Sequence, residues 1–319
     1  MEHPSGMENE QGIYEWPRRL RFLPSGAGLM SPEMSRLRKN LSAGFYTLFF
    51  TGIAATQAGA KGVVLASTEL PATGTIITWT KAAAMTGMAL KVNSGSRETS
   101  GTLDQKQETA ATTTILSADK VQFLATRKTT AGTIVIDGQE RPSKQPEFLL
   151  KDIPVSLERK DGAWLKPTLE SGEGLSEAQT KELLDQEAVR SFKEGLGIYG
   201  LGEHEAGEKW QIDVSKVLSF AGLDKPAGTI SAEFVAIETI SGTECATIKL
   251  TFDVTGTLID DVKVHLQGES VTHRSIADRI DLDSKLTGKV DMTASPQPGT
   301  TVTVTGPIQT ERTNTVKKP

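Results

Sequence analysis

Polar and apolar residues alternate along much of the C-terminal half of the chain. Every second residue is apolar in 248–254, 262–266, 280–282, 290–292 and 302–304. Successive side chains of a strand point to opposite faces, so a period of two indicates strands with one buried face and one face in water. A few turn residues separate these runs, which predicts an antiparallel meander.

The residues before this region indicate further strands. Between 73 and 170 the chain is rich in Thr, Ser and Gly, and its short apolar runs are bounded by Gly, Asn, Asp and Pro. This composition is typical of strands joined by turns. We therefore expect an N-terminal β-rich part over residues 61–170. Within it, the polar stretch 94–114 is expected to be a long turn or a solvated pair of strands.

One amphipathic helix interrupts the strands. Ser176 and Gln179 have the spacing of a capping box, and the helix is expected to end at Gly195 and Gly197. The expected fold is mainly β, an antiparallel meander forming a half-barrel or a barrel with this helix packed on it. Helix and meander span residues 171–310, and 311–319 form a C-terminal tail. The apolar positions of the helix are Leu183, Leu184, Ala188, Phe192 and Leu196.

The N-terminal region has the layout of an export signal. Met34 precedes a basic cluster, and an apolar run over 41–60 ends in small residues that suit cleavage after Ala60. The run is also about long enough for a membrane anchor of roughly 20 residues, and a buried core helix is a third interpretation. Polar residues within the run favour cleavage. We expect a signal peptide over 34–60 and a periplasmic or secreted protein.

Residues 1–33 contain five acidic residues and four prolines without a periodic pattern. Such a composition is typical of a disordered tail. Alternatively, these residues precede the true start of translation at Met34. In either case, membrane contact is expected only through the signal segment.

Charge and composition narrow the classes of partner. Residues 61–319 hold 29 of the 35 basic and 35 of the 40 acidic residues, a net charge of −6. Because the basic residues are dispersed among acidic ones and aromatic residues are few, we expect no nucleic-acid partner. Cys245 is the only cysteine, so no internal disulfide can form. We expect it to fill space within a strand.

Two segments match the sequence motifs of a cofactor site and of a catalytic site. Gly195-Leu-Gly197-Ile-Tyr-Gly200 matches the dinucleotide fingerprint, but it follows a helix, whereas the fingerprint must follow a strand and open a helix. Ser117 and Lys120 have the spacing of an S-x-x-K motif, but its companion motifs are absent. We expect a glycine turn and an exposed turn, with no catalytic residue and no cofactor.

The residues able to bind metals do not form a recognisable site. Glu203, His204, Glu205 and Glu208 are close in sequence, but neighbours on an extended chain point to opposite faces. We expect a solvated loop there. Three aspartates lack the spacing of a calcium-binding loop and are expected on the wet face of a strand, and two histidines are expected to be exposed. No metal site is therefore expected. These five residues are Asp278, Asp281, Asp283, His265 and His273.

The order of elements resembles that of exported β-rich envelope proteins of bacteria with no assigned activity. The resemblance covers residues 175–295: a short amphipathic helix, the step from Gly207 to Trp210, a long meander, and the segment 279–286 leading into a last strand pair at Thr287. The general shape of those proteins is similar to that of half-barrel carriers, which hold lipid tails in the periplasm. The resemblance carries no catalytic residue to this chain.

We therefore expect an exported, non-catalytic β-rich protein that binds an apolar or lipid-like ligand, or an envelope protein, in the bacterial envelope. Two alternatives stay open. One is a secreted hydrolase whose site is assembled from distant loops. The other is a structural or adhesive module that pairs through a strand edge.

Terminal sequencing of the protein recovered from its own cells tests the export signal. We expect the mature chain to begin at Lys61, because small residues at positions 58 and 60 suit signal peptidase. An intact N-terminus at Met34 would favour the membrane anchor. Any peptide from residues 1–33 would show that those residues are translated.

Overall fold

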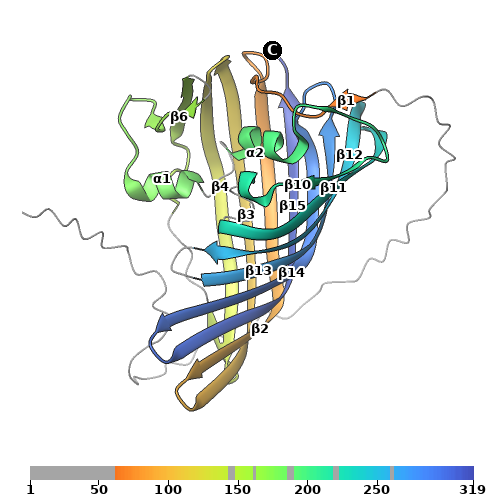
Figure 1. Cartoon of the computed structure of the whole chain (residues 1–319). Coiled ribbons are helices and arrows are strands. Elements are labelled where there is room, and N and C mark those ends of the chain that lie inside the picture. Colours follow the sequence, from red (N-terminus) through yellow and green to blue (C-terminus); the bar gives the residue numbers. More distant parts are fainter. Residues whose placement is uncertain (1–61, 143–147, 161–162, 185–189, 218–222, 259–261) are drawn as a thin grey trace, which may run out of the picture. The chain divides into compact units, whose positions relative to one another are not determined.

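The chain folds around one large antiparallel sheet (Figure 1). The computed structural model describes residues 62–142, 148–160, 163–184, 190–217, 223–258 and 262–319. The helices are α1 (Glu177–Leu184), α2 (Arg190–Tyr199) and the 3-10 helix η1 (Val214–Lys216). The strands are β1 (Val63–Val64), β2 (Ile76–Ser94), β3 (Arg97–Ser117), β4 (Lys120–Ile136), β5 (Gln139–Pro142), β6 (Pro154–Lys160), β7 (Ala163–Trp164), β8 (Thr168–Leu169), β9 (Glu203–His204), β10 (Lys209–Ile212), β11 (Asp224–Ile240), β12 (Thr243–Leu258), β13 (Val262–Ser275), β14 (Asp281–Gln297) and β15 (Thr300–Lys317).

The large sheet joins both halves of the sequence. Its strand order is β10-β11-β12-β13-β14-β15-β2-β3-β4-β6-β7, with β5 paired to β4 and β8 to β6, while β1 and β9 form a separate pair. The last strand, β15, pairs along its length with the first long strand, β2. Residues 61–170 and 171–310 therefore contribute to one continuous sheet. β15 also contains residues 311–317, which the sequence placed in a tail.

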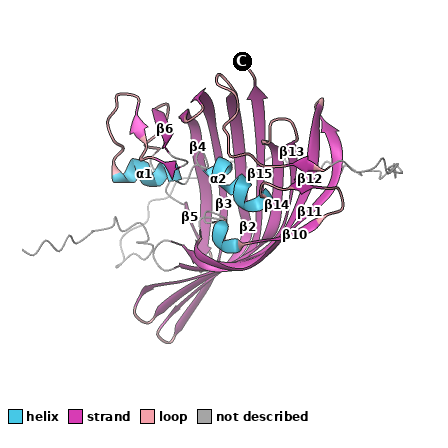
Figure 2. Cartoon of the chain, turned by 45° about the horizontal axis from the view of Figure 1, so that its top comes forward, coloured by secondary structure: helices cyan, strands magenta, loops and turns pink. Residues whose placement is uncertain are grey.

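The sheet is curved but open (Figure 2). β10 and β7 stand at opposite ends of the strand order. The structure thus confirms the prediction of a mainly β, antiparallel fold, and it does not confirm the half-barrel or barrel form. The predicted signal segment and the tail before it lie outside the residues that the structure describes.

The inner face of the sheet, defined as the face that carries Phe252, Leu266 and Val290, holds the larger core. The alternation seen in the sequence produces this face, because each of these apolar residues lies between polar neighbours. Ile212 of the edge strand β10 belongs to this core, and Tyr199 of α2 packs in it, so α2 covers part of the concave side (Figure 2). Burying one such side chain fully stabilises the fold by about 1.5–3 kcal/mol.

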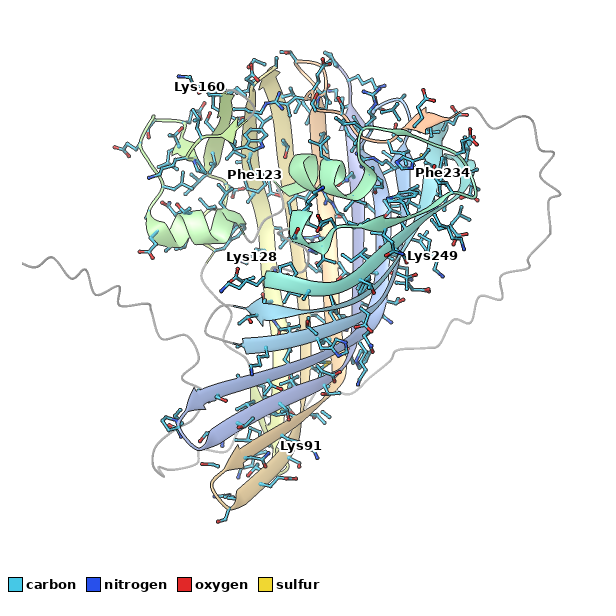
Figure 3. All side chains as sticks on the ribbon, in the orientation of Figure 1. Lys91, Phe123, Lys128, Lys160, Phe234 and Lys249 are labelled. Atoms are coloured by element: carbon cyan, nitrogen blue, oxygen red, sulfur yellow. The ribbon has the colours of Figure 1, made fainter. Side chains whose placement is uncertain are left out.

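A second, smaller core lies between β2, β3, β4 and β6. Trp79, Ile115 and Phe123 are large strand residues of this core, and Leu183 of α1 belongs to it as well. Figure 3 labels one residue of each core, Phe123 on β4 and Phe234 on β11. Each short helix therefore packs on a different part of the sheet.

The helical region differs from the prediction of one helix between Ser176 and Leu196. The predicted capping box is confirmed. The backbone N–H of Gln179 donates to Ser176 Oγ at 3.3 Å, and the backbone N–H of Ser176 donates to Gln179 Oε1 at 3.0 Å. However, the structure has two helices, with residues 185–189 outside the described part. α2 also runs past Gly195 and Gly197 to Tyr199.

Those two glycines serve close packing instead of ending the helix. A Cβ at Gly195 would lie 3.2 Å from Arg274 Nη2, and a Cβ at Gly197 would lie 3.1 Å from the Lys216 carbonyl oxygen. The residue that follows the helix is Gly200, whose φ of +65° is the left-handed conformation typical of a helix end. Glycine thus has two different roles within six residues.

A pair of glycines also marks where β13 and β14 approach closely. Gly268 and Gly288 are direct partners. A Cβ at Gly268 would lie 2.3 Å from the Thr287 carbonyl oxygen, and one at Gly288 would lie 2.4 Å from the Gln267 carbonyl oxygen. Side chains cannot occupy such space unless the strands move apart, so this pair permits the local backbone geometry.

Replacing Gly268 with alanine should lower the free energy of unfolding by about 1–3 kcal/mol, because the new methyl group collides with backbone. Urea denaturation measures the change. Gly202→Ala is the control, since a Cβ at Gly202 would have no neighbour within 4 Å, and its effect should stay within about 0.5 kcal/mol. Equal effects of the two substitutions would contradict this account.

Candidate functional site

A pocket of about 450 Å³ opens at one end of the inner face. It lies between the segment 66–72, α2, the turn between β13 and β14, and the C-terminal end of β15. Its volume falls within the range of about 300–1,000 Å³ that is typical of small-molecule sites. Its apolar wall includes Leu70, Ile77, Leu196, Ile280 and Val316.

Arg274 is the buried charge in the pocket wall, with its side chain 7% exposed. Its Nε donates to the Leu65 carbonyl at 2.6 Å, and its Nη1 donates to Asp281 Oδ1 at 2.5 Å. The guanidinium lies 4.3 Å from the centroid of the Tyr199 ring, and the Tyr199 hydroxyl donates to the same Asp281 oxygen at 3.3 Å. This cluster connects the segment around Leu65, α2, β13 and β14.

Burial and charge shift the pKa values within the cluster. Burial raises the pKa of Tyr199 well above its ordinary value, and the negative charge of Asp281 raises it further. Burial of the Arg274 guanidinium acts to lower its pKa, but the charge of Asp281 and the contact with Tyr199 outweigh burial, so the pKa is raised. At neutral pH Tyr199 is therefore neutral and Arg274 is charged.

A β-bulge brings Asp281 to Arg274. His273 pairs with Asp283 and Arg274 pairs with Asp281, so Leu282 is an extra residue in β14. A bulge changes the direction of the neighbouring side chains. As a result, Asp281 reaches the inner face, whereas Asp283 binds His273 on the outer face. The Asn314 side-chain amide of β15 donates to the Asp281 carbonyl and holds the bulge from the other side.

Partly exposed apolar residues continue along the inner face from this end of the sheet. We call them the apolar inner strip. Direct strand pairing places them on one face, because Met292 pairs with Val304 and Ile308 pairs with Met85. Each keeps part of its surface exposed while it packs on the larger core. The strip consists of Met85, Leu103, Leu286, Met292, Val304 and Ile308.

The strip and the pocket adjoin along β15. Arg312 lines the pocket, and Ile308 belongs to the strip. The two residues are four positions apart on one strand and therefore face the same side, at a separation of about 13 Å. A ligand of modest length can contact both.

The cluster around His204 is not the solvated loop that the sequence indicated. Glu203 and Glu205 are exposed as expected, but His204 is buried. Its Nε2 donates to the Tyr199 carbonyl at 2.6 Å, and its ring centroid lies 4.3 Å from that of Trp210. Glu208 Oε1 lies 3.2 Å from Nδ1, but among the described residues this nitrogen has no hydrogen-bond partner. The pairing of β9 with β1 and the contact with Trp210 exclude water here.

Of the three aspartates and two histidines weighed as ligands, two lie at the pocket. Asp278 and Asp281 line it. The prediction that all three aspartates lie on the wet face of a strand was therefore wrong for Asp281, because of the bulge, and for Asp278, which lies in the turn between β13 and β14. His265 and His273 lie on the outer face and are less exposed than expected, since each has a carboxylate partner, at 2.7 Å and 2.6 Å respectively.

The residues weighed as nucleophiles do not come together. Cys245 is buried within β12, as expected for a residue that fills space. Ser117 and Lys120 are paired at the turn between β3 and β4, where the sequence predicted a turn. In the described part of the chain, no group of three or more His, Cys, Asp or Glu residues is placed to hold a metal ion.

Sequence reasoning missed Arg274 and Tyr199. A signal for Arg274 was present, because the alternating pattern of β13 places residues 266, 268, 270, 272 and 274 on the inner face. A charge at an inward position requires a buried partner. Tyr199 gave no such signal, since the helix was expected to end before it.

Comparison with known proteins gives little further information. No family model matches the chain, and no curated protein matches it. One solved structure that it resembles was determined to describe lipid–protein interactions in lipovitellin, with 8% sequence identity and a TM-score of 0.39. The likeness covers 77% of this chain and 26% of that one. A likeness this weak carries no argument about the present chain. Among the described helices, none has the length and apolar character needed to cross a membrane.

Replacing Arg274 with leucine should lower the free energy of unfolding by about 3 kcal/mol, because Asp281 then keeps a charge without its buried partner. The double variant Arg274→Leu/Asp281→Leu should recover a large share of this loss. Chemical denaturation of the three proteins measures both changes. Equal stability of the single variant and the unchanged protein would show that the cluster does not hold these segments together.

Proposed function

We propose that this chain is an exported, non-catalytic protein that holds an apolar or lipid-like ligand against the inner face of its sheet. The observation that supports this proposal best is the apolar inner strip, whose six side chains stay partly exposed beside a pocket of about 450 Å³. Partly exposed apolar side chains gathered on one face are typical of interaction sites.

Energetics favour an apolar ligand over a polar one. Covering about 300 Å² of apolar surface would stabilise a complex by about 7 kcal/mol, before the cost of immobilising the ligand. The strip offers only side chains of Met, Leu, Val and Ile, which provide no strong hydrogen-bonding group to a ligand. Binding there therefore depends on the apolar area of the ligand.

The open form of the sheet suits a ligand that enters from the side. α2 covers the inner face near the pocket, where Leu196 and Tyr199 pack on the core. The strip lies on β2, β3, β14 and β15. A flexible chain can thus lie along the strip with one end in the pocket.

Export is the second part of the proposal. It is supported by the basic cluster after Met34, the apolar run over 41–60 and the small residues before Lys61. An apolar ligand carrier in the bacterial envelope fits this combination, because lipids must cross an aqueous layer there.

Titration of the full-length, delipidated protein with a fluorescent sixteen-carbon alcohol tests the proposal. We expect saturable binding. Val304→Asp should weaken it at least tenfold, because a charge then has to be covered by the apolar chain. Thr303→Asp is the matched control, since Thr303 is the next residue of β15 and points to the other face, opposite Lys91. Its affinity should change less than twofold.

Circular dichroism of both variants separates lost binding from lost folding. If Val304→Asp does not fold, Val304→Thr serves in its place, with an expected loss of a few-fold, because it adds a hydroxyl at nearly constant volume. Absence of binding by the unchanged protein would contradict the proposal, as would equal weakening by the inner and outer substitutions.

A further inference from the structure

The pocket lining carries as many acidic as basic groups, so it has no excess of either charge. Lys318 Nζ lies 2.7 Å from Asp278 Oδ1. Arg274 Nη1 lies 2.5 Å from Asp281 Oδ1. A charged head that left water for this pocket would find no surplus of the opposite charge to offset the cost of its desolvation. The basic groups are Arg274, Arg279, Arg312 and Lys318, and the acidic groups are Glu69, Asp278, Asp281 and the terminal carboxylate of Pro319.

Thr75 brings an uncharged polar group to the same pocket. The residue is 3% exposed and lines the pocket together with Ile77, two positions further along the chain. Its backbone N–H donates to the Ala72 carbonyl at 3.0 Å, and its carbonyl accepts a hydrogen bond from the Ile115 N–H at 2.9 Å. These two bonds fix the backbone of Thr75 directly before β2 begins.

The hydroxyl of Thr75 remains available to a ligand. Among the residues that the structure describes, it makes no hydrogen bond. In the same part of the chain, His204 Nδ1 is the only fully enclosed side-chain nitrogen or oxygen without a partner. The Thr75 oxygen is therefore not sealed within the core, and it opens onto the pocket that the residue lines.

The wall around Thr75 is apolar. Ile77 pairs with Val316 across β2 and β15, and both residues line the pocket, as does Leu70. An apolar ligand that covered this wall would remove water from the hydroxyl without replacing its hydrogen bond, which weakens binding. A polar head with a donor or an acceptor would restore that bond.

We propose that the pocket binds the uncharged polar head of an amphiphile, such as a hydroxyl or ester group, through a hydrogen bond with Thr75. The tail lies on the apolar inner strip. This inference rests on the proposed function and names the class of ligand. A threonine hydroxyl both donates and accepts hydrogen bonds, so it suits an alcohol or an ester carbonyl. The balanced charges of the lining give no advantage to an ionised head.

Two ligands that share one tail test the role of Thr75. The full-length, delipidated protein is titrated at pH 8 with a fluorescent sixteen-carbon alcohol and with the same molecule without its hydroxyl. Thr75→Val should weaken binding of the alcohol about three- to tenfold, as the loss of one hydrogen bond implies. The affinity for the hydrocarbon should not fall, and this also shows that the variant pocket is folded. If Thr75→Val does not fold, Thr75→Ala serves in the same comparison.

Two further variants serve as controls. Thr75→Ser keeps the hydroxyl and should keep the affinity for the alcohol. Thr78→Val removes a hydroxyl from the outer face, where Thr78 lies between the inward-facing Ile77 and Trp79 and contacts Thr112 Oγ1 at 3.4 Å. Neither affinity should change in this variant. A loss of alcohol binding in Thr78→Val equal to that in Thr75→Val would overturn the assignment to Thr75.

The charge of the head is tested with the corresponding carboxylate and ammonium compounds. Neither should bind more tightly than the alcohol, because the lining has no excess charge to attract it. Tighter binding of either ion would reject the uncharged head and leave the proposed function standing.

The remaining outcomes distinguish this inference from the proposed function. An unchanged affinity for the alcohol in Thr75→Val would reject the inference alone. An equal loss for alcohol and hydrocarbon would also reject it, since the substitution would then act on the shape of the pocket. Binding of neither ligand by the unchanged protein would reject the proposed function and this inference with it.

Discussion

A single sheet can shield an apolar face only by curving around it or by packing other elements on it, and this chain does both. The inner face carries the larger core, with α2 packed on part of it and Ile212 of the edge strand β10 contributing to it. The close approach of β13 and β14 at Gly268 and Gly288 is one place where backbone geometry demands residues without side chains. Because the strand order stays open between β10 and β7, part of the apolar face keeps contact with solvent. The proposed ligand site follows from this incomplete coverage.

The cluster of Arg274, Asp281 and Tyr199 lies where the covered part of the inner face meets the pocket. A buried guanidinium is costly to desolvate, and here Asp281, Tyr199 and the Leu65 carbonyl offset that cost. The same contacts hold the N-terminal segment and α2 against β13 and β14, and those elements form the walls of the pocket. The pocket therefore owes its shape to a polar cluster, whereas the strip beside it owes its character to strand periodicity.

The sequence predicted the features that depend on local periodicity and missed those that depend on long-range contacts. Alternation identified the strands from residue 248 onward, and the capping box at Ser176 and Gln179 was correct in atomic detail. Gly195 and Gly197 led to a wrong prediction of the helix end, because in the structure they allow close packing against Arg274 and Lys216. The bulge at Leu282 reversed the expected side of Asp281, because an extra residue in a strand leaves no mark on composition. The pairing of β15 with β2 could not be foreseen from either strand alone.

Native mass spectrometry with lipid extraction, applied to the full protein recovered from its own envelope fraction, tests most directly whether the inner face holds an apolar ligand. The account predicts a co-purifying molecule with a long acyl or isoprenoid chain, bound at one copy per protein and lost in Val304→Asp. A protein mass without ligand, together with an empty lipid extract from correctly folded material, would contradict it.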